Sequence, residues 1–340
     1  MLGKLLGGRT SAESGPYNEA DMLRSIAGEA LSEQKKARRW GVFFKLLTFA
    51  YLFIILTMFY TTGSKGFVNS GSSDTHTALI RIDGVIAADQ QASANRAATG
   101  LRKAFENENA KAILIAINSP GGSPVQAGYI NDEIARLRLL HPEKPVYASI
   151  ADLGASGGYY IAAAADEIYA DKASLVGSIG VTASSFGFVE AMGKMGVERR
   201  HFTAGEHKSF LDPFSPLKPA EIGFWKEVLA NTHEQFIDVV KRGRGDRLNF
   251  DVASGGLDEK TMFSGLIWNG EQALELGLID GLGSAGYVAR DVVGAEDIVD
   301  YTVRDSPLKE LTRQLGASVG VGIARSMGVG SPEAAPLSLR

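Results

Sequence analysis

The chain has 340 residues, of which 45% are hydrophobic and 22% are charged, and its formal net charge is −4. This length suits one good-sized globular domain with appendages, and a charge so close to neutral gives no indication of a nucleic-acid partner. The absence of cysteine excludes disulfides, thiolate metal sites and a cysteine nucleophile. The five histidines lack the H-E-x-x-H spacing of a zinc site, so neither a metal nor a cofactor is expected.

Residues 1–40 are predicted to be an N-terminal tail that contains an amphipathic helix. The segment begins as a polar, Gly- and Ser-containing stretch. Over residues 19–39 apolar side chains then recur at helical spacing, namely Met22, Ile26, Ala30 and Leu31. A solvated tail is the simplest interpretation of this segment.

Residues 41–62 are predicted to form a transmembrane helix, because about 20 apolar residues suffice to cross the hydrocarbon core. Trp40 and Tyr60 lie at its two ends, where interfacial aromatic residues are common. Cationic residues gather at its N-terminal side, namely Lys35, Lys36, Arg38, Arg39 and Lys45. The positive-inside rule therefore predicts a single-pass protein of the inner (cytoplasmic) membrane, with a cytoplasmic N-terminus and the rest of the chain outside. The stretch lacks the early start and the A-x-A site of a cleaved signal peptide, so we expect an anchor.

A Gly- and Ser-rich linker is predicted over residues 63–76, followed by a domain over 77–300 in which strands alternate with helices. Strands are expected at 78–82, 112–117, 145–150, 167–170 and 175–182, and helices at 93–106, 125–140, 159–165, 190–195 and 220–242. Residues 255–283 are expected to add short helical and strand turns, and residues 301–340 a C-terminal helix over 308–327 and a tail. The alternation indicates stacked βαβ units and a mainly parallel sheet, with sites at the carboxyl ends of its strands.

Ser156 lies on a turn between an expected strand and an expected helix, next to Gly157 and Gly158. Such a turn holds a hydroxyl away from the backbone, and the first amides of the helix can stabilise an oxyanion above it. This geometry suits attack on a carbonyl. The alternative is an ordinary N-cap serine, the usual role of serine at the start of a helix.

A serine nucleophile needs a base, and the residue pattern alone leaves that base undecided. His207 could serve together with Asp152 or Asp212, but no spacing selects them. Lys208 lies in a loop with several apolar residues, and a lysine must lose its charge through burial before it can accept a proton. A solvated surface lysine is the simpler alternative.

Three motifs, taken together, closely resemble those of the signal peptide peptidase A family. They are NSPGG at residues 118–122, GASGGYY at 154–160 and GSIGV at 177–181, and residues 265–283 resemble the closing motif of the family. The resemblance covers residues 78–292. It implies a Clp-protease/crotonase-like α/β fold of repeated ββα units with a mainly parallel sheet, preceded by one transmembrane helix.

The same resemblance assigns roles to individual residues. Ser156 matches the nucleophile, Lys208 matches the general base, and Ser178 matches the serine that hydrogen-bonds this lysine. The amide of Gly157, with one from Gly121 or Gly122, matches the oxyanion hole. The closing motif departs from the usual pattern at residues 266–270, where Tyr/Trp-Thr-Gly is commoner.

The resemblance therefore implies a membrane-anchored serine endopeptidase with a Ser–Lys dyad. It would act on hydrophobic peptides such as cleaved signal peptides, and it would assemble into a homo-oligomeric ring in which the lysine and the serine can come from neighbouring subunits. Two alternatives stay open. One is a non-catalytic membrane scaffold of the same fold, and the other is a crotonase-like enzyme that acts on acyl thioesters.

Overall fold

The computed structural model describes residues 19–65 and 74–304. Contacts divide the chain into two compact units, Met1–Val68 and Asn69–Arg340. The predicted C-terminal helix over 308–327 and the tail lie outside the described residues, as do residues 66–73 of the predicted linker. The two units are taken separately below.

The first unit contains one continuous helix, α1 (Glu19–Lys65). It joins the predicted amphipathic segment and the predicted transmembrane segment without a break. The stretch Gln34–Thr57 has a mean hydropathy of 1.9 over 24 residues and is long and apolar enough to cross a membrane. At 1.5 Å per residue it is about 36 Å long, which exceeds the ~30 Å of the hydrocarbon core.

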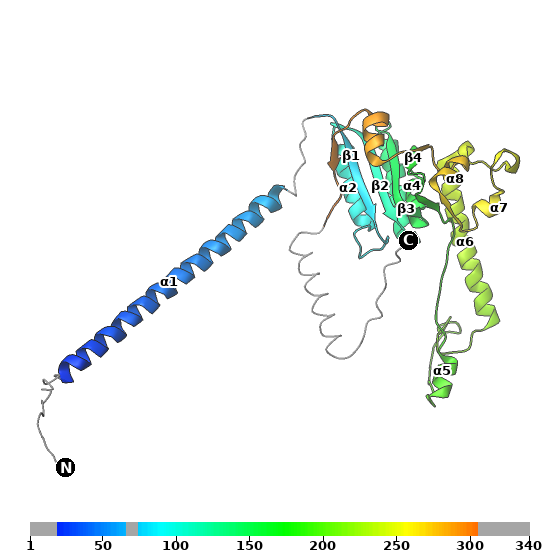
Figure 1. Ribbon diagram of the computed structural model, residues 1–340. Coiled ribbons are helices and arrows are strands. Elements are labelled where there is room, and N and C mark those ends of the chain that lie inside the picture. The colour runs from blue at the N-terminus through cyan, green and yellow to red at the C-terminus, as the bar shows by residue number, and fades with distance from the viewer. Residues whose placement is uncertain (1–18, 66–73, 305–340) are drawn as a thin grey trace, which may run out of the picture. The chain divides into compact units, whose positions relative to one another are not determined.

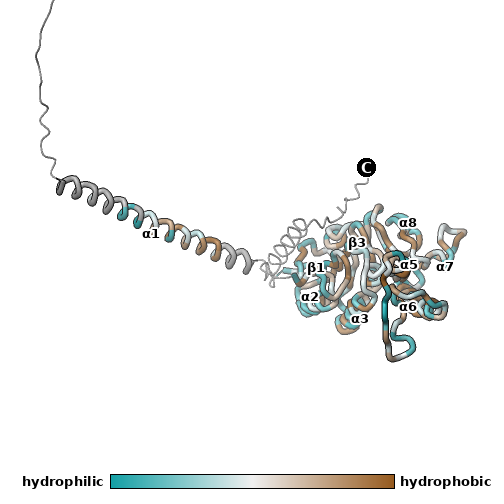
Figure 2. Tube along the Cα trace, turned by 90° about the horizontal axis from the view of Figure 1, so that it is seen from below, coloured by the Kyte–Doolittle hydropathy of each residue, from teal (hydrophilic) through white to brown (hydrophobic). Residues whose placement is uncertain are grey.

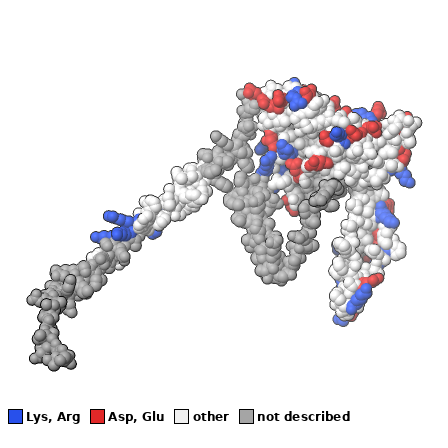
Figure 3. All heavy atoms as spheres, in the orientation of Figure 1, with Lys and Arg blue, Asp and Glu red and all other residues white. Residues whose placement is uncertain are grey.

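Charge and aromatic side chains mark one end of this apolar stretch. Lys and Arg side chains gather on α1 and are followed by an uncharged surface (Figure 3) that is apolar near the end of the helix (Figure 2). The ring of Trp40 lies 5.7 Å from those of Phe43 and Phe44. A cationic and aromatic collar beside an apolar span is typical of a helix end at a membrane surface.

The second unit is built on one mainly parallel sheet (Figure 1). Its strands are β1 (His76–Asp83), β2 (Ala110–Ser119), β3 (Val146–Ala155), β4 (Glu167–Ala170), β5 (Leu175–Gly177), β6 (Ile267–Asn269), β7 (Gly281–Leu282) and β8 (Ile298–Asp300). The order is β6-β5-β3-β2-β1-β8, with β4 paired to β3 and β7. Only the β5–β6 pair is antiparallel among the described strands. The α/β class with a mainly parallel sheet, predicted from sequence, is confirmed.

Helices complete the unit: α2 (Ala94–Glu106), α3 (Pro124–Leu140), α4 (Gly157–Ala162), α5 (Val189–Lys194), α6 (Pro219–Arg244), α7 (Glu259–Met262), α8 (Gly270–Glu275) and α9 (Ala285–Tyr287). Both α3 and α6 begin at a proline, whose missing N–H costs nothing in the first turn. The N-cap Ser123 of α3 also accepts a hydrogen bond from the Gln126 amide.

The side chains of β1 and β2 alternate between two cores, as the period of a strand requires. On one face Ile113, Ile115 and Ile117 join the large core, which includes residues of α2, α3, α4 and α6. On the other face Ala112 and Leu114 join a smaller core that includes Val288 and Val293. The sheet is therefore buried on both faces over its central strands, typical of a parallel sheet.

Buried charge fixes the carboxyl end of α6. Arg244 is 1% exposed, and its guanidinium donates two hydrogen bonds to Asp280, at 2.6 and 2.9 Å. Asp280 in turn accepts the amide of Ile168 in β4, at 2.7 Å. Helix α6 is thus tied to the sheet at one end.

Residues 183–218, here called the arm, lie beyond the other end of α6 and include α5 (Figure 1). The arm has its own small aromatic contact, with the rings of Phe188 and Phe214 stacked at 5.3 Å. Much of its apolar surface is exposed, including Phe186 at 81% and Phe202 at 91%. Such exposed apolar surface is typical of an interaction surface.

Candidate active site

Strands β3 and β5 end side by side, and each is followed by a serine. Ala155 pairs with Gly177 in the parallel ladder, and the Ser156 amide donates to the Gly177 carbonyl at 2.8 Å. Ser156 and Ser178 both have positive φ angles, of 52° and 51°. A non-glycine residue rarely takes this conformation, and the strain is concentrated at functional sites.

Ser156 stands at the N-cap position of α4 but does not cap the helix. Its hydroxyl makes no hydrogen bond to the first turn. The alternative interpretation as an ordinary capping serine is therefore wrong. The side chain is partly buried and lines a cavity of about 900 Å³ instead.

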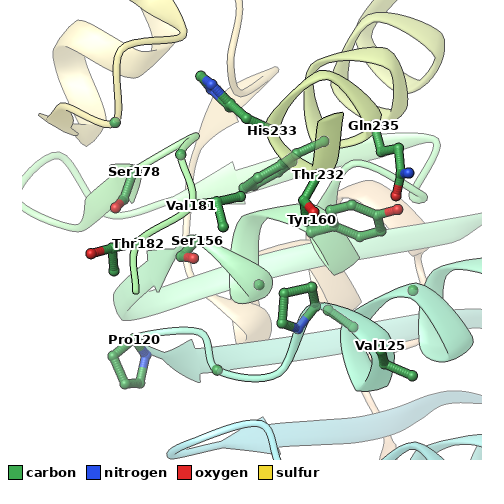
Figure 4. Close-up of a pocket in the computed structure, with 18 of the residues that line it drawn as sticks. Pro120, Val125, Ser156, Tyr160, Ser178, Val181, Thr182, Thr232, His233 and Gln235 are labelled. Carbon is green, nitrogen blue, oxygen red and sulfur yellow. The ribbon is translucent and has the colours of Figure 1, made fainter. Parts of the chain in front are cut away.

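The cavity lies between the ends of the strands and helices α3 and α6. Figure 4 shows the hydroxyl-bearing side chains of Ser156, Ser178 and Thr182 together on one side. Thr232, His233 and Gln235 of α6 approach from another side, and Pro120 and Val125 form a further wall (Figure 4). The cavity therefore combines nucleophile-type hydroxyls with apolar walls.

The turn after β2 passes directly beside Ser156. A Cβ atom added to Gly121, whose φ is 94°, would lie 2.7 Å from both the Gly157 amide nitrogen and the Ser156 Cβ. Only glycine allows the two turns to approach this closely. The two Gly-Gly turns therefore meet at the carboxyl ends of β2 and β3, the edge at which the sequence predicts a site.

The amides of this turn differ in their hydrogen bonds. The Gly121 amide donates to the Ser119 hydroxyl at 3.1 Å, and that hydroxyl donates to the Gly84 carbonyl at 2.7 Å. Among the described residues no acceptor is found for the Gly122 or the Gly157 amide. A Cβ built on Gly157 would lie 3.4 Å from the Gly122 nitrogen, so these two donors are neighbours.

Lys208, the base implied by the resemblance, lies apart from this cluster in the single chain. It is exposed on the arm and does not line the cavity. His207 is likewise exposed and also does not line the cavity. The structure thus brings together Ser156, Ser178 and the glycine turns, but not Lys208.

The two aspartates considered as partners of His207 are engaged elsewhere. Asp212 is bound by Arg199 and by the Ser215 hydroxyl, which together hold the pKa of its carboxyl at about 2. The Asp152 carboxylate accepts a hydrogen bond from the side-chain amide of Asn118 at 3.0 Å. A Ser–His–Asp arrangement around His207 is therefore not assembled.

Sequence reasoning missed the contribution of α6 to the cavity. His233 Nε2 lies 3.0 Å from the Ile179 carbonyl, which connects α6 to the turn that carries Ser178. The Phe236 ring lies 5.0 Å from that of Tyr160, and both residues line the cavity. The sequence predicts a helix at 220–242, but no sequence signal places that helix beside Ser156.

The model of peptidase family S49 matches residues 138–296, which include Ser156, Ser178 and Lys208. A candidate protease of Synechocystis sp. is 31% identical over 242 residues, covering 70% of this chain and 82% of that protein. The chain belongs to peptidase family S49. A relative described as a candidate signal peptide peptidase SppA, from Enterococcus faecium, is 28% identical over 253 residues. The match covers 72% of this chain and 68% of that protein.

A further relative has a name of a different kind. The Na(+)/H(+) antiporter NhaA of Brucella abortus is 47% identical over 194 residues, covering 57% of this chain. The chain spans only 25% of the length of that relative. The antiporter name therefore belongs to a much longer protein, of which this chain matches only one part. Membership in S49 favours a serine-type peptidase over the crotonase-like alternative.

Proposed function

We propose that the chain is a membrane-anchored serine endopeptidase in which the Ser156 hydroxyl attacks the peptide carbonyl. One observation carries the proposal. Ser156 leaves a strand with a positive φ, makes no capping bond, and faces the cavity beside two glycine turns. Backbone strain at a hydroxyl that faces a cavity, beside amides without an acceptor among the described residues, suits a nucleophile with an oxyanion hole.

The oxyanion hole in this proposal uses the Gly157 and Gly122 amides. The resemblance leaves a choice between Gly121 and Gly122. Because the Gly121 amide already donates to Ser119, Gly122 is the better donor. Donors of this kind stabilise the negative charge that develops on the carbonyl oxygen, and each contributes about 10²–10³ in rate.

Lys208 acts in the proposal from a second copy of the chain. The arm that carries it has much exposed apolar surface, so docking on another copy would bury that surface. Burial favours the neutral form of a lysine, the form that can accept a proton. Ser178, next to Ser156 through the β3–β5 pair, is positioned to hydrogen-bond the incoming amine.

The reaction is then an acyl transfer in two steps. The lysine amine removes the proton of the Ser156 hydroxyl, and the oxygen bonds to the carbonyl carbon. The C–N bond breaks as the ammonium returns its proton to the leaving amine. The lysine amine next deprotonates a water molecule, whose oxygen bonds to the acyl carbon. The bond between that carbon and the Ser156 oxygen breaks, the new carboxyl end of the peptide leaves, and the lysine ammonium returns its proton to the Ser156 oxygen.

Substrate and location follow from α1 and the apolar walls. An extended peptide can pair with backbone beside residues 121–125 and 181–185, with side chains in the cavity. Anchoring at the inner membrane, with a cytoplasmic N-terminus and the peptidase on the outer side, favours hydrophobic peptides such as cleaved signal peptides. The cationic end of α1 supports this orientation.

The test is cleavage of a synthetic signal peptide by the detergent-solubilised full chain, with the cuts mapped by mass spectrometry. Ser156→Ala is expected to abolish cleavage. Ser254→Ala, which removes an exposed hydroxyl that does not line the cavity, is expected to cleave like the wild type. Equal cleavage by the wild type and Ser156→Ala would refute the assignment.

A further inference from the structure

One face of α3 forms a wall of the cavity and ends at a carboxylate. Val125, Gly128, Tyr129 and Asp132 line the cavity at spacings of three, four and seven residues, which places them on one side of the helix. Seven residues advance about 10 Å along a helix. Asp132 therefore lies about two turns beyond the end of α3 that adjoins the Gly121–Gly122 turn.

Asp132 is the only Asp, Glu, Lys or Arg among the described residues that line this cavity. Its charged neighbours on α3 have partners. Glu133 is paired with Arg102 at 2.6 Å and with Arg136 at 2.7 Å, and Arg138 is paired with Asp166. Within the described part of the chain no cation lies within ion-pair distance of Asp132. The cavity thus carries one negative charge without a partner.

Two aromatic rings line the same cavity as Ser156 and this carboxylate. The rings of Tyr160 and Phe236 lie 5.0 Å apart in a tilted arrangement. Burial raises the pKa of Tyr160, and the Asp132 charge raises it further, whereas Arg242 acts in the opposite sense. Asp132 is thus close enough to affect the Tyr160 hydroxyl, and the exposed Arg242 is a cation that acts on the same hydroxyl.

We propose that Asp132 is a specificity-determining residue that binds a lysine or arginine side chain of the peptide substrate. The methylene stem of such a side chain would lie along Tyr160 and Phe236, and its charged head would reach the carboxylate. Lysine and arginine bury their stems against apolar surface in this way while the charge stays at a polar group. The inference rests on the proposed function, because it assumes that the peptide occupies this cavity.

Two peptides that differ only by an ammonium group test the proposal. In the first series, a lysine is placed in turn at each position on either side of the bond that is cut. In the second series, norleucine takes the place of that lysine. We expect the wild type to prefer lysine at one position by about fivefold in kcat/KM, the factor that a partly exposed ion pair supplies. In Asp132→Asn the kcat/KM for the lysine peptide is expected to fall until it equals that for the norleucine peptide.

Asp238→Asn is the matched control, because Asp238 is an exposed aspartate on α6 that does not line the cavity. It is expected to keep the preference for lysine. Binding is measured separately on Ser156→Ala, with and without Asp132→Asn, by fluorescence anisotropy of the same peptides.

The two assays separate the failure of the inference from the failure of the proposed function. A dissociation constant fivefold lower for lysine than for norleucine, lost with Asp132→Asn, supports the inference even if no peptide is cleaved. Equal binding of the two peptides, or a preference that survives Asp132→Asn, overturns it even if cleavage depends on Ser156.

Discussion

At the scale of single residues, the site depends on backbone that is costly to form. Ser156 and Ser178 each adopt a positive φ, which costs about 1–3 kcal/mol for a residue with a side chain. The ladder bond between the Ser156 amide and the Gly177 carbonyl holds both turns in place. The surrounding sheet therefore stabilises a conformation that neither serine would adopt alone.

Replacement of Gly121 should damage the site without removing any group that takes part in the reaction. In Gly121→Ala the new Cβ would lie 2.7 Å from the Gly157 nitrogen, so the two turns must separate. We expect kcat/KM to fall by about 10²-fold or more, as when one oxyanion donor is lost. Peptide cleavage measures the loss of kcat/KM, and thermal unfolding measures how far the separation of the two turns lowers stability.

Gly223→Ala provides the control, because Gly223 lies within α6 with open space around it. It is expected to leave activity unchanged and to add about 0.5–1 kcal/mol to stability, since alanine is the better helix former. A Gly121→Ala variant as active as Gly223→Ala would show that the close approach of the turns is not needed.

At the scale of elements, charge joins the helices that frame the site. Glu133 of α3 binds Arg102 of α2 and Arg136 of its own helix. The hydrogen bond from Arg136, with help from Arg102, lowers the pKa of Glu133 to about 2. Because its pKa is lower in the folded chain than in the unfolded chain, this carboxyl stabilises the fold above its ordinary pKa.

The sign of the pH effect follows directly. The contribution of the Glu133 carboxylate to the free energy of unfolding is complete above about pH 4.5 and is lost as the pH falls toward 2. Since both arginines are about half exposed, we expect Glu133→Gln to cost only about 1 kcal/mol at pH 7. Denaturant unfolding of the solubilised chain at pH 7 and near pH 2 should show the difference from wild type disappearing at the lower pH.

Glu227→Gln serves as the comparison, since Glu227 is an exposed glutamate on α6. Its effect on the free energy of unfolding should be small at both pH values. A Glu133→Gln deficit that persists unchanged at low pH would mean that packing, and not charge, gives Glu133 its role.

Local pattern predicted most elements of the second unit well. The strand at 167–170 has the bounds of β4, and α3 and α6 begin within one residue of expectation. The strand expected over 175–182 instead ends at Gly177, because Ser178 turns to a positive φ. Apolar periodicity cannot reveal such a turn, which depends on contact with β3 and on the Leu266 carbonyl that accepts the Ser178 amide.

The site was only partly predictable for the same reason. Ser156, Ser178 and the glycines lie on motifs at strand ends, where parallel sheets place their sites. Asp132 and His233 were not singled out, because they reach the cavity from α3 and α6, helices far apart in the sequence. The proposed role of Lys208 in a second copy involves more than one chain, and no pattern within a single sequence can locate such a contact.

At the scale of the whole molecule, the chain combines one helix long and apolar enough to span a membrane with a peptidase-family unit. The described chain holds the proposed nucleophile and the proposed oxyanion donors in one cavity, and it leaves the proposed base on an arm with exposed phenylalanines. A head-to-tail assembly of copies would let each arm complete the cavity of a neighbour. The account therefore predicts that activity belongs to the assembly and not to the monomer.

Co-expression of two inactive variants tests this claim most directly. Ser156→Ala and Lys208→Ala carry different affinity tags, and mixed oligomers are purified through both tags before peptide cleavage is measured. Each variant alone should be inactive. If serine and lysine come from adjacent copies, random mixing in a closed ring restores about a quarter of the wild-type activity per chain. Mixed oligomers that stay inactive, or a Lys208→Ala variant that is active alone, would contradict the account.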